Sequence, residues 1–153
     1  MRHTSVADVA IPFAVIGLAV YGVLRFSYDS LPPLQFYVPI PLAMLGIAEL
    51  IAARRVRAAV RHDPNARPMA AIVIARCVAL GKASALVAAG VAGAAVALLV
   101  RVIPDAGTVR AASSDLRVAI FLLLASVLLL LAGILLERSG IDPNQRRPPT
   151  GST

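Results

Sequence analysis

The chain has 153 residues, of which 59% are hydrophobic and 15% are charged. Soluble domains carry about 25% charged residues, so the composition argues against an ordinary soluble domain and indicates an integral membrane protein built of helices. In a soluble protein the net charge of +7 would suggest a nucleic-acid partner, but here the basic residues flank apolar segments, which indicates membrane orientation and contact with anionic lipid instead.

Four apolar segments have the length of a membrane-crossing helix, which needs about 20 residues. Inside lipid every backbone polar group has to be satisfied internally, and this requirement favours helices. We therefore predict an all-α integral membrane protein in which residues 1–140 form one domain, a four-transmembrane-helix bundle. The predicted spans are residues 6–24, 34–53, 77–100 and 118–136.

The first span, residues 6–24, has the position of a signal peptide, but we predict a retained helix. Its flank is only weakly basic, and no clear Ala-x-Ala cleavage site follows it. In the next loop the aromatic pair Phe36 and Tyr37 suits a membrane interface. Pro39 and Pro41 are expected to delay the regular start of the second span, since proline fits only the first turn of a helix.

The loops orient the predicted bundle. With four spans, the two termini and the middle loop share one side of the membrane, and that side carries more cations than the other. The positive-inside rule then makes both termini cytoplasmic in a multi-pass protein of the cell membrane. The first side has Arg2, Arg54, Arg55, Arg57, Arg61, Arg67, Arg138, Arg146 and Arg147, and the second has Arg25, Arg101, Arg110 and Arg117.

Glu49 is the only acidic residue within the second span, and Lys82 lies inside the third. If the two spans form a hairpin whose turn centres near Asn65, Glu49 falls at the same height as Lys82. The simplest hypothesis is an ion pair that fixes the register of the two helices inside the membrane. Two alternatives stay open: a role in substrate binding or proton coupling, or no contact, with each side chain reaching the interface separately.

The hairpin is expected to extend beyond the membrane as a short cytoplasmic stub, residues 54–76. Its first half is amphipathic, with arginines on one face and Val56, Ala59 and Val60 on another. Residues 69–75, "MAAIVIA", are apolar enough to cover the second face or to lie in the interface. The residues predicted to contact anionic lipid or a protein partner are Arg54, Arg55, Arg57, Arg61 and Arg76.

The third span is rich in small residues, and the fourth is rich in leucine. Ala85, Ala89, Gly93 and Ala97 recur every four residues, which is typical of close helix packing in lipid. We therefore predict a central third helix and a mostly lipid-facing fourth. The same stripe would also suit self-association, so a homo-oligomer stays possible.

The sequence lacks the patterns of common catalytic and cofactor sites. The two histidines are far apart, so no metal site is indicated. No phosphate-binding or dinucleotide-binding glycine motif occurs, and we expect neither a cofactor nor an enzyme. Lys82 and Ser84 are two residues apart on a helix and cannot face each other, which disfavours a serine–lysine hydrolase. Residues 141–153 are polar and rich in proline, and we predict a disordered tail.

Four short stretches follow one another in a familiar order: "LPPL" (31–34), "AELIAARRVR" (48–57), "ARCVALGKASALVAAGVAG" (75–93) and "LLERSGIDP" (135–143). In this order the chain resembles domain-of-unknown-function family 3180, small four-span membrane proteins of actinobacteria. The resemblance covers nearly the whole chain. It implies a plasma-membrane location in a bacterium and supplies neither an activity nor functional residues.

The leading functional prediction is a non-catalytic membrane protein that scaffolds or regulates a partner through its basic stub. The alternative is a small oligomeric transporter or proton-coupled carrier that uses Glu49 and Lys82. The expected partners are a bilayer with anionic lipid at the cytoplasmic face and an unidentified protein.

Overall fold

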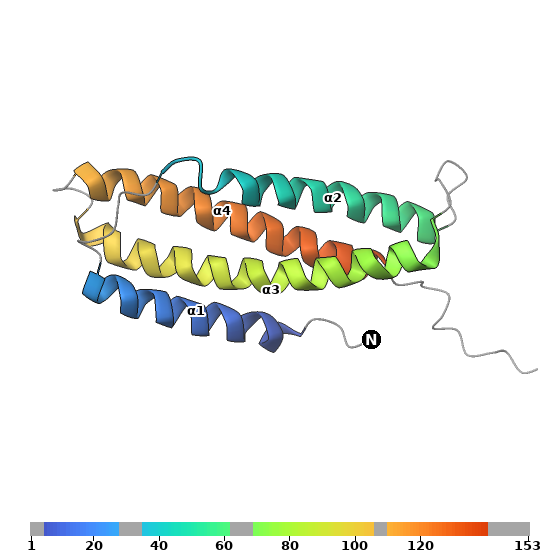
Figure 1. Ribbon diagram of the computed structural model, residues 1–153, viewed down its shortest axis with the longest axis horizontal. Helices are drawn as coiled ribbons and strands as arrows, with labels where there is room; N and C mark the ends of the chain where they lie inside the picture. Colours follow the sequence, from blue (N-terminus) through green and yellow to red (C-terminus); the bar gives the residue numbers. More distant parts are fainter. Residues whose placement is uncertain (1–4, 28–34, 62–68, 106–109, 141–153) are drawn as a thin grey trace, which may run out of the picture.

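The computed structural model describes residues 5–27, 35–61, 69–105 and 110–140, and the described chain is helical over most of its length (Figure 1). This confirms the all-α prediction. The predicted tail (141–153), the turn residues 62–68 and the start of the predicted second span lie outside the described residues. The elements are α1 (Val6–Ser27), α2 (Ile40–Val60), α3 (Ala71–Val102), the short 3₁₀ turn η2 (Ile103–Asp105) and α4 (Arg110–Ser139).

Local sequence signals explain where the first two helices begin. The backbone N–H of Ser5 donates to Oδ2 of Asp8 at 2.9 Å, and the backbone N–H of Ala7 donates to Oγ of Ser5 at 3.1 Å. This reciprocal arrangement is a capping box. α2 has Pro39 at its cap and Pro41 in its first turn, where a missing N–H removes no helical bond. α2 therefore begins later than the predicted span, as the prolines indicated.

Within the part of the chain that the structure describes, three helices are long and apolar enough to cross a membrane: α1, α3 and α4 from Ala112 onward. α3 has 32 residues, roughly 48 Å at 1.5 Å per residue, which exceeds the ~30 Å hydrocarbon core. α2 has 21 residues but carries Glu49 and three arginines, so by composition it is less clearly a span.

The helices pack in the spatial order α1, α3, α4, α2 (Figure 1). α4 lies between α2 and α3 and packs along both, whereas α2 and α3 have little direct contact. The prediction of a mostly lipid-facing fourth helix is therefore wrong. The reason is a face of small residues on α4, which lets two neighbours approach it closely. The buried small residues of this face are Ala119, Ala125, Ser126, Ala132 and Gly133.

Two apolar clusters mark the two ends of the bundle. One joins the end of α1 to the end of α3 and the start of α4, through Leu24, Leu98 and Ala112. The other joins the end of α2 to the end of α4 and the start of α3, through Val56 and Leu136 with flanking apolar side chains. Consequently α1 and α3 run in one direction, and α2 and α4 run in the opposite direction (Figure 1).

Glycines bring the backbones of neighbouring helices together. A Cβ atom on Gly133 would lie 2.6 Å from the carbonyl oxygen of Gly81, so α3 and α4 meet there without side chains between them. A Cβ atom on Gly17 of α1 would lie 3.2 Å from the carbonyl oxygen of Gly93 on α3. Close backbone approach of this kind holds helices together in lipid. The small-residue stripe of α3 is buried at all four positions: Ala85, Ala89, Gly93 and Ala97.

Candidate functional site

Glu49 is the most unusual side chain of the bundle. It lies in the middle of α2, is 2% exposed, and its Oε1 accepts a hydrogen bond from the Ser84 hydroxyl on α3. Its other oxygen, Oε2, is buried and has no hydrogen-bond partner among the residues that the structure describes. Buried polar atoms are paired in the large majority of cases, so an unpaired carboxylate oxygen calls for an explanation.

Tight packing on α4 keeps this carboxyl group away from solvent. One turn before Glu49, a Cβ atom on Gly46 would lie 3.3 Å from backbone atoms of Leu129. α2 therefore rests directly on the α4 backbone at this height. On the other side of α4, the backbones of Gly81 and Gly133 are in contact, and this brings α3 close enough for Ser84 to reach Glu49 past α4.

The contact that the structure gives Glu49 differs from the one that the sequence suggested. Lys82 is half-buried on α3, two residues before Ser84 and about 200° around the helix from it. The Glu49–Lys82 ion pair stays a prediction, since the described partner of the carboxyl group is Ser84. Ser84 lies two residues from Lys82, the position that the sequence placed at the height of Glu49.

Ser84 is the site residue that sequence reasoning missed. The signal that could have found it is its residue type, because Ser84 and Ser126 are the two hydroxyl residues within the third and fourth apolar runs. Ser126 is also fully buried, but its hydroxyl donates to the carbonyl oxygen of Leu122 in its own helix at 2.6 Å. Ser126 is therefore satisfied locally, whereas Ser84 uses its hydroxyl between helices.

Two further acids are buried near the ends of α4. Asp115 is 5% exposed and Glu137 is 6% exposed. Each of them has an interaction partner, in contrast to Oε2 of Glu49. Over the described residues no group of three or more His, Cys, Asp or Glu side chains could hold a metal ion.

The second candidate site is the basic stub. Val56 is fully buried in the cluster with Ala53 and Leu136, and Met69 and Ile74 pack against that cluster. The segment that includes Met69 and Ile74 thus covers the apolar face of α2. The arginines lie on the opposite face of α2, which is exposed. The exposed arginines at this end are Arg54, Arg55, Arg57, Arg61, Arg76 and, from α4, Arg138.

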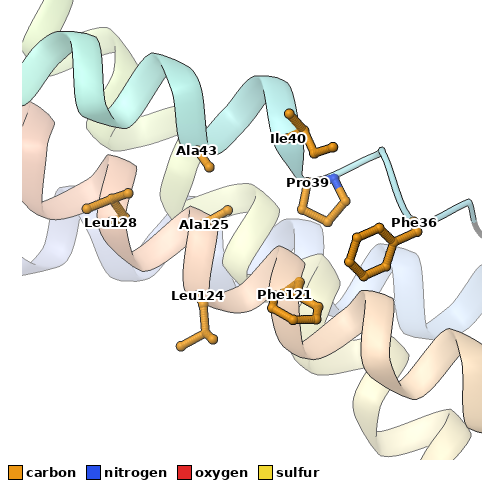
Figure 2. A pocket seen from close by; sticks show the side chains of 8 residues that line it. All are labelled: Phe36, Pro39, Ile40, Ala43, Phe121, Leu124, Ala125 and Leu128. Atoms are coloured by element: carbon orange, nitrogen blue, oxygen red, sulfur yellow. The ribbon is translucent and has the colours of Figure 1, made fainter.

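An apolar groove lies at the other end of α2, beside α4. It encloses about 270 Å³, and its wall is almost wholly apolar. Figure 2 shows Phe36 and Phe121 at one end of the groove, and their rings meet edge to face with centroids 5.4 Å apart. The remaining lining residues are Pro39, Ile40, Ala43, Leu124, Ala125 and Leu128. The groove offers apolar contact and no group for chemistry.

A family model described as "protein of unknown function (DUF3180)" matches residues 9–143. The chain belongs to this family. The resemblance that the sequence showed is thereby confirmed. No curated protein and no solved structure matches the chain. The DUF3180 match begins inside α1 and extends past the end of α4, so the Glu49–Ser84 contact, the stub and the groove all lie within it.

Proposed function

We propose that this DUF3180 protein is a non-catalytic, multi-pass protein of the cell membrane that docks a partner at the cytoplasmic face through its basic stub. In this proposal all four helices cross the membrane and both termini are cytoplasmic. The direction of the helices supports four spans. α1 and α3 run the same way, so the chain has to return between them, and α2 is the described helix that runs back (Figure 1).

The docking proposal rests on the two faces of the stub, one apolar and buried, the other basic and exposed. Its apolar face is already covered from inside the molecule, where Val56 is fully buried beneath Met69 and Ile74. The arginine face is therefore held in a fixed orientation by a packed core. Arg54, Arg57 and Arg61 follow one another at helical spacing on that face, and all three are exposed. This surface has the charge to bind acidic protein segments or anionic lipid headgroups.

The test reverses the charge of the exposed face. The triple variant Arg54→Glu, Arg57→Glu, Arg61→Glu should reduce recovery of a stoichiometric partner by more than about tenfold, because each cation near the surface contributes ~1 kcal/mol. Recovery is measured by isolating the tagged protein from its native membrane in mild detergent and quantifying co-purified proteins by mass spectrometry.

The matched control reverses two exposed arginines at the opposite end of the bundle, Arg25→Glu with Arg117→Glu. This control should retain the partner. Equal loss from both variants would show a general effect of charge, and isolation of the wild-type protein without any stoichiometric partner would contradict the docking role.

A second candidate function is a small oligomeric transporter or proton-coupled carrier that uses Glu49 and Lys82. The observation that favours it is the burial of Glu49 in the middle of α2. Ionisable residues inside the membrane are often part of substrate or proton pathways. Glu49→Gln distinguishes the two functions: a carrier loses its transport activity in this variant, whereas partner docking through the stub persists.

A further inference from the structure

We propose that Glu49 and Ser84 form an intramembrane proton-binding site, in which Oε2 of Glu49 carries a proton and the folded bundle holds the side chain as a neutral carboxylic acid. This inference does not rest on the docking role of the stub. It rests on the unpaired Oε2 atom, on the Ser84 contact and on the charges that surround the carboxyl group.

The hydrogen bonds of the site leave one carboxyl oxygen without a partner. Ser84 donates its hydroxyl hydrogen to Oε1, and Oε2 is enclosed without any donor among the described residues. An ionised carboxylate in this position would place negative charge on an oxygen that nothing stabilises. Isolated charge in an apolar interior is far more costly than a neutral polar group, so uptake of a proton on Oε2 relieves the larger part of that cost.

Among the residues that the structure describes, the carboxyl group of Glu49 has Ser84 as its hydrogen-bond partner and no charged group beside it as a fixed counter-ion. On α2 the nearest cation is Arg54, which is exposed and lies five residues further on. α4 has no charged residue between positions 118 and 136, the stretch that packs against α2 at this height. On α3 the nearest cation is Lys82, which stands about 200° around the helix from Ser84. The neutral form of Glu49, with a proton on Oε2, therefore suits this arrangement of charges.

Infrared difference spectroscopy tests the proposal on the full-length protein in lipid at neutral pH. Subtracting the spectrum of Glu49→Gln from that of the wild type should leave the carbonyl stretch of a carboxylic acid. Asp8→Asn is the matched control, because Asp8 is exposed and its substitution should remove only carboxylate bands. If Glu49→Gln instead removes carboxylate bands, Glu49 is ionised and the proposal is overturned.

Two further variants keep the test decisive if Glu49→Gln does not fold. Ser84→Ala should shift the acid band of the wild type to higher frequency, because the carbonyl oxygen loses its hydrogen bond. Lys82→Met should leave the band unchanged. A carboxylic-acid band that appears only after Lys82→Met would show that the wild-type residue is the anion of a Glu49–Lys82 ion pair.

Exchange into heavy water then measures whether solvent reaches the carboxyl group of Glu49, since the band shifts only if the proton is replaced by deuterium.

Discussion

At the scale of single residues, the Ser84–Glu49 hydrogen bond is a polar link between two helices that have little other contact. Ser84→Ala removes the donor and leaves the whole buried carboxyl group unsatisfied, so we expect it to lower the free energy of unfolding by about 1–3 kcal/mol. The double variant Glu49→Met with Ser84→Ala removes both polar groups and should lie within about 1 kcal/mol of the wild type. Thermal or denaturant unfolding in detergent measures both.

Measuring the single variant Glu49→Met as well completes a double-mutant cycle, which distinguishes a paired site from two independent residues. Additive losses from the two substitutions would mean that Glu49 and Ser84 do not interact. As a control, Ser126→Ala affects a hydroxyl that bonds within its own helix, and it should show no coupling to Glu49.

The sequence did not indicate the hydrogen bond between Glu49 and Ser84. Counting residues from the turn between α2 and α3 placed Glu49 opposite position 82, and the described partner is two residues further on. Such counting fixes distance along the helices and does not fix rotation about their axes. The rotation of α2 and α3 about their axes depends on α4, which lies between them. No local sequence pattern around Glu49 or Lys82 indicates that α4 takes this place.

At the scale of whole helices, the contact between Gly81 and Gly133 sets the distance between α3 and α4. Gly133→Ala would place a Cβ atom 2.6 Å from the carbonyl oxygen of Gly81, so the helices have to move apart. We expect a loss of about 1–3 kcal/mol, as for overpacking elsewhere, measured by unfolding in detergent. Because Ser84 lies three residues from Gly81, the displacement should also weaken its bond to Glu49.

Gly22→Ala in α1 is the matched control for this prediction. A Cβ atom at Gly22 meets nothing within 4 Å. Alanine favours a helix over glycine by about 1 kcal/mol, so this substitution should be neutral or stabilising. If both alanine variants behave alike, the loss at Gly133 reflects something other than contact between α3 and α4.

The positions of α1, α3 and α4 were largely predictable from apolar runs of sufficient length, whereas the central place of α4 was not. The sequence of α4 is rich in leucine, which suggests lipid contact on all sides of the helix. The informative signal is the sparse repeat of Ala119, Ser126 and Gly133 at every seventh residue, all three of which are buried. The amphipathic stub was predicted from its alternation of arginines and valines, because that pattern is local to one helix.

At the scale of the whole molecule, the decisive question is whether α2 crosses the membrane. In the proposed four-span arrangement Gln35 lies outside the cell and Ala70 lies inside, because α2 separates them. If α2 instead rests on one surface, both positions lie on the same side. The two residues suit the test, because both are exposed, Gln35 precedes α2 and Ala70 directly precedes α3.

The measurement uses single cysteines in a Cys77→Ser background, which removes the native thiol of the described chain. On intact cells, a membrane-impermeant maleimide should label Gln35→Cys and should spare Ala70→Cys until the membrane is opened. Labelling of both positions on intact cells, or of neither, would remove α2 from the set of spans and would move Glu49 out of the hydrocarbon. Such a result would also change the charge balance of the loops on which the predicted orientation rests, because the stub would then share a side with Arg25, whereas Arg101, Arg110 and Arg117 would lie across the membrane from it. The predicted pattern would place the arginine face in the cytoplasm and Glu49 inside the membrane, as the docking role and the proton site each require.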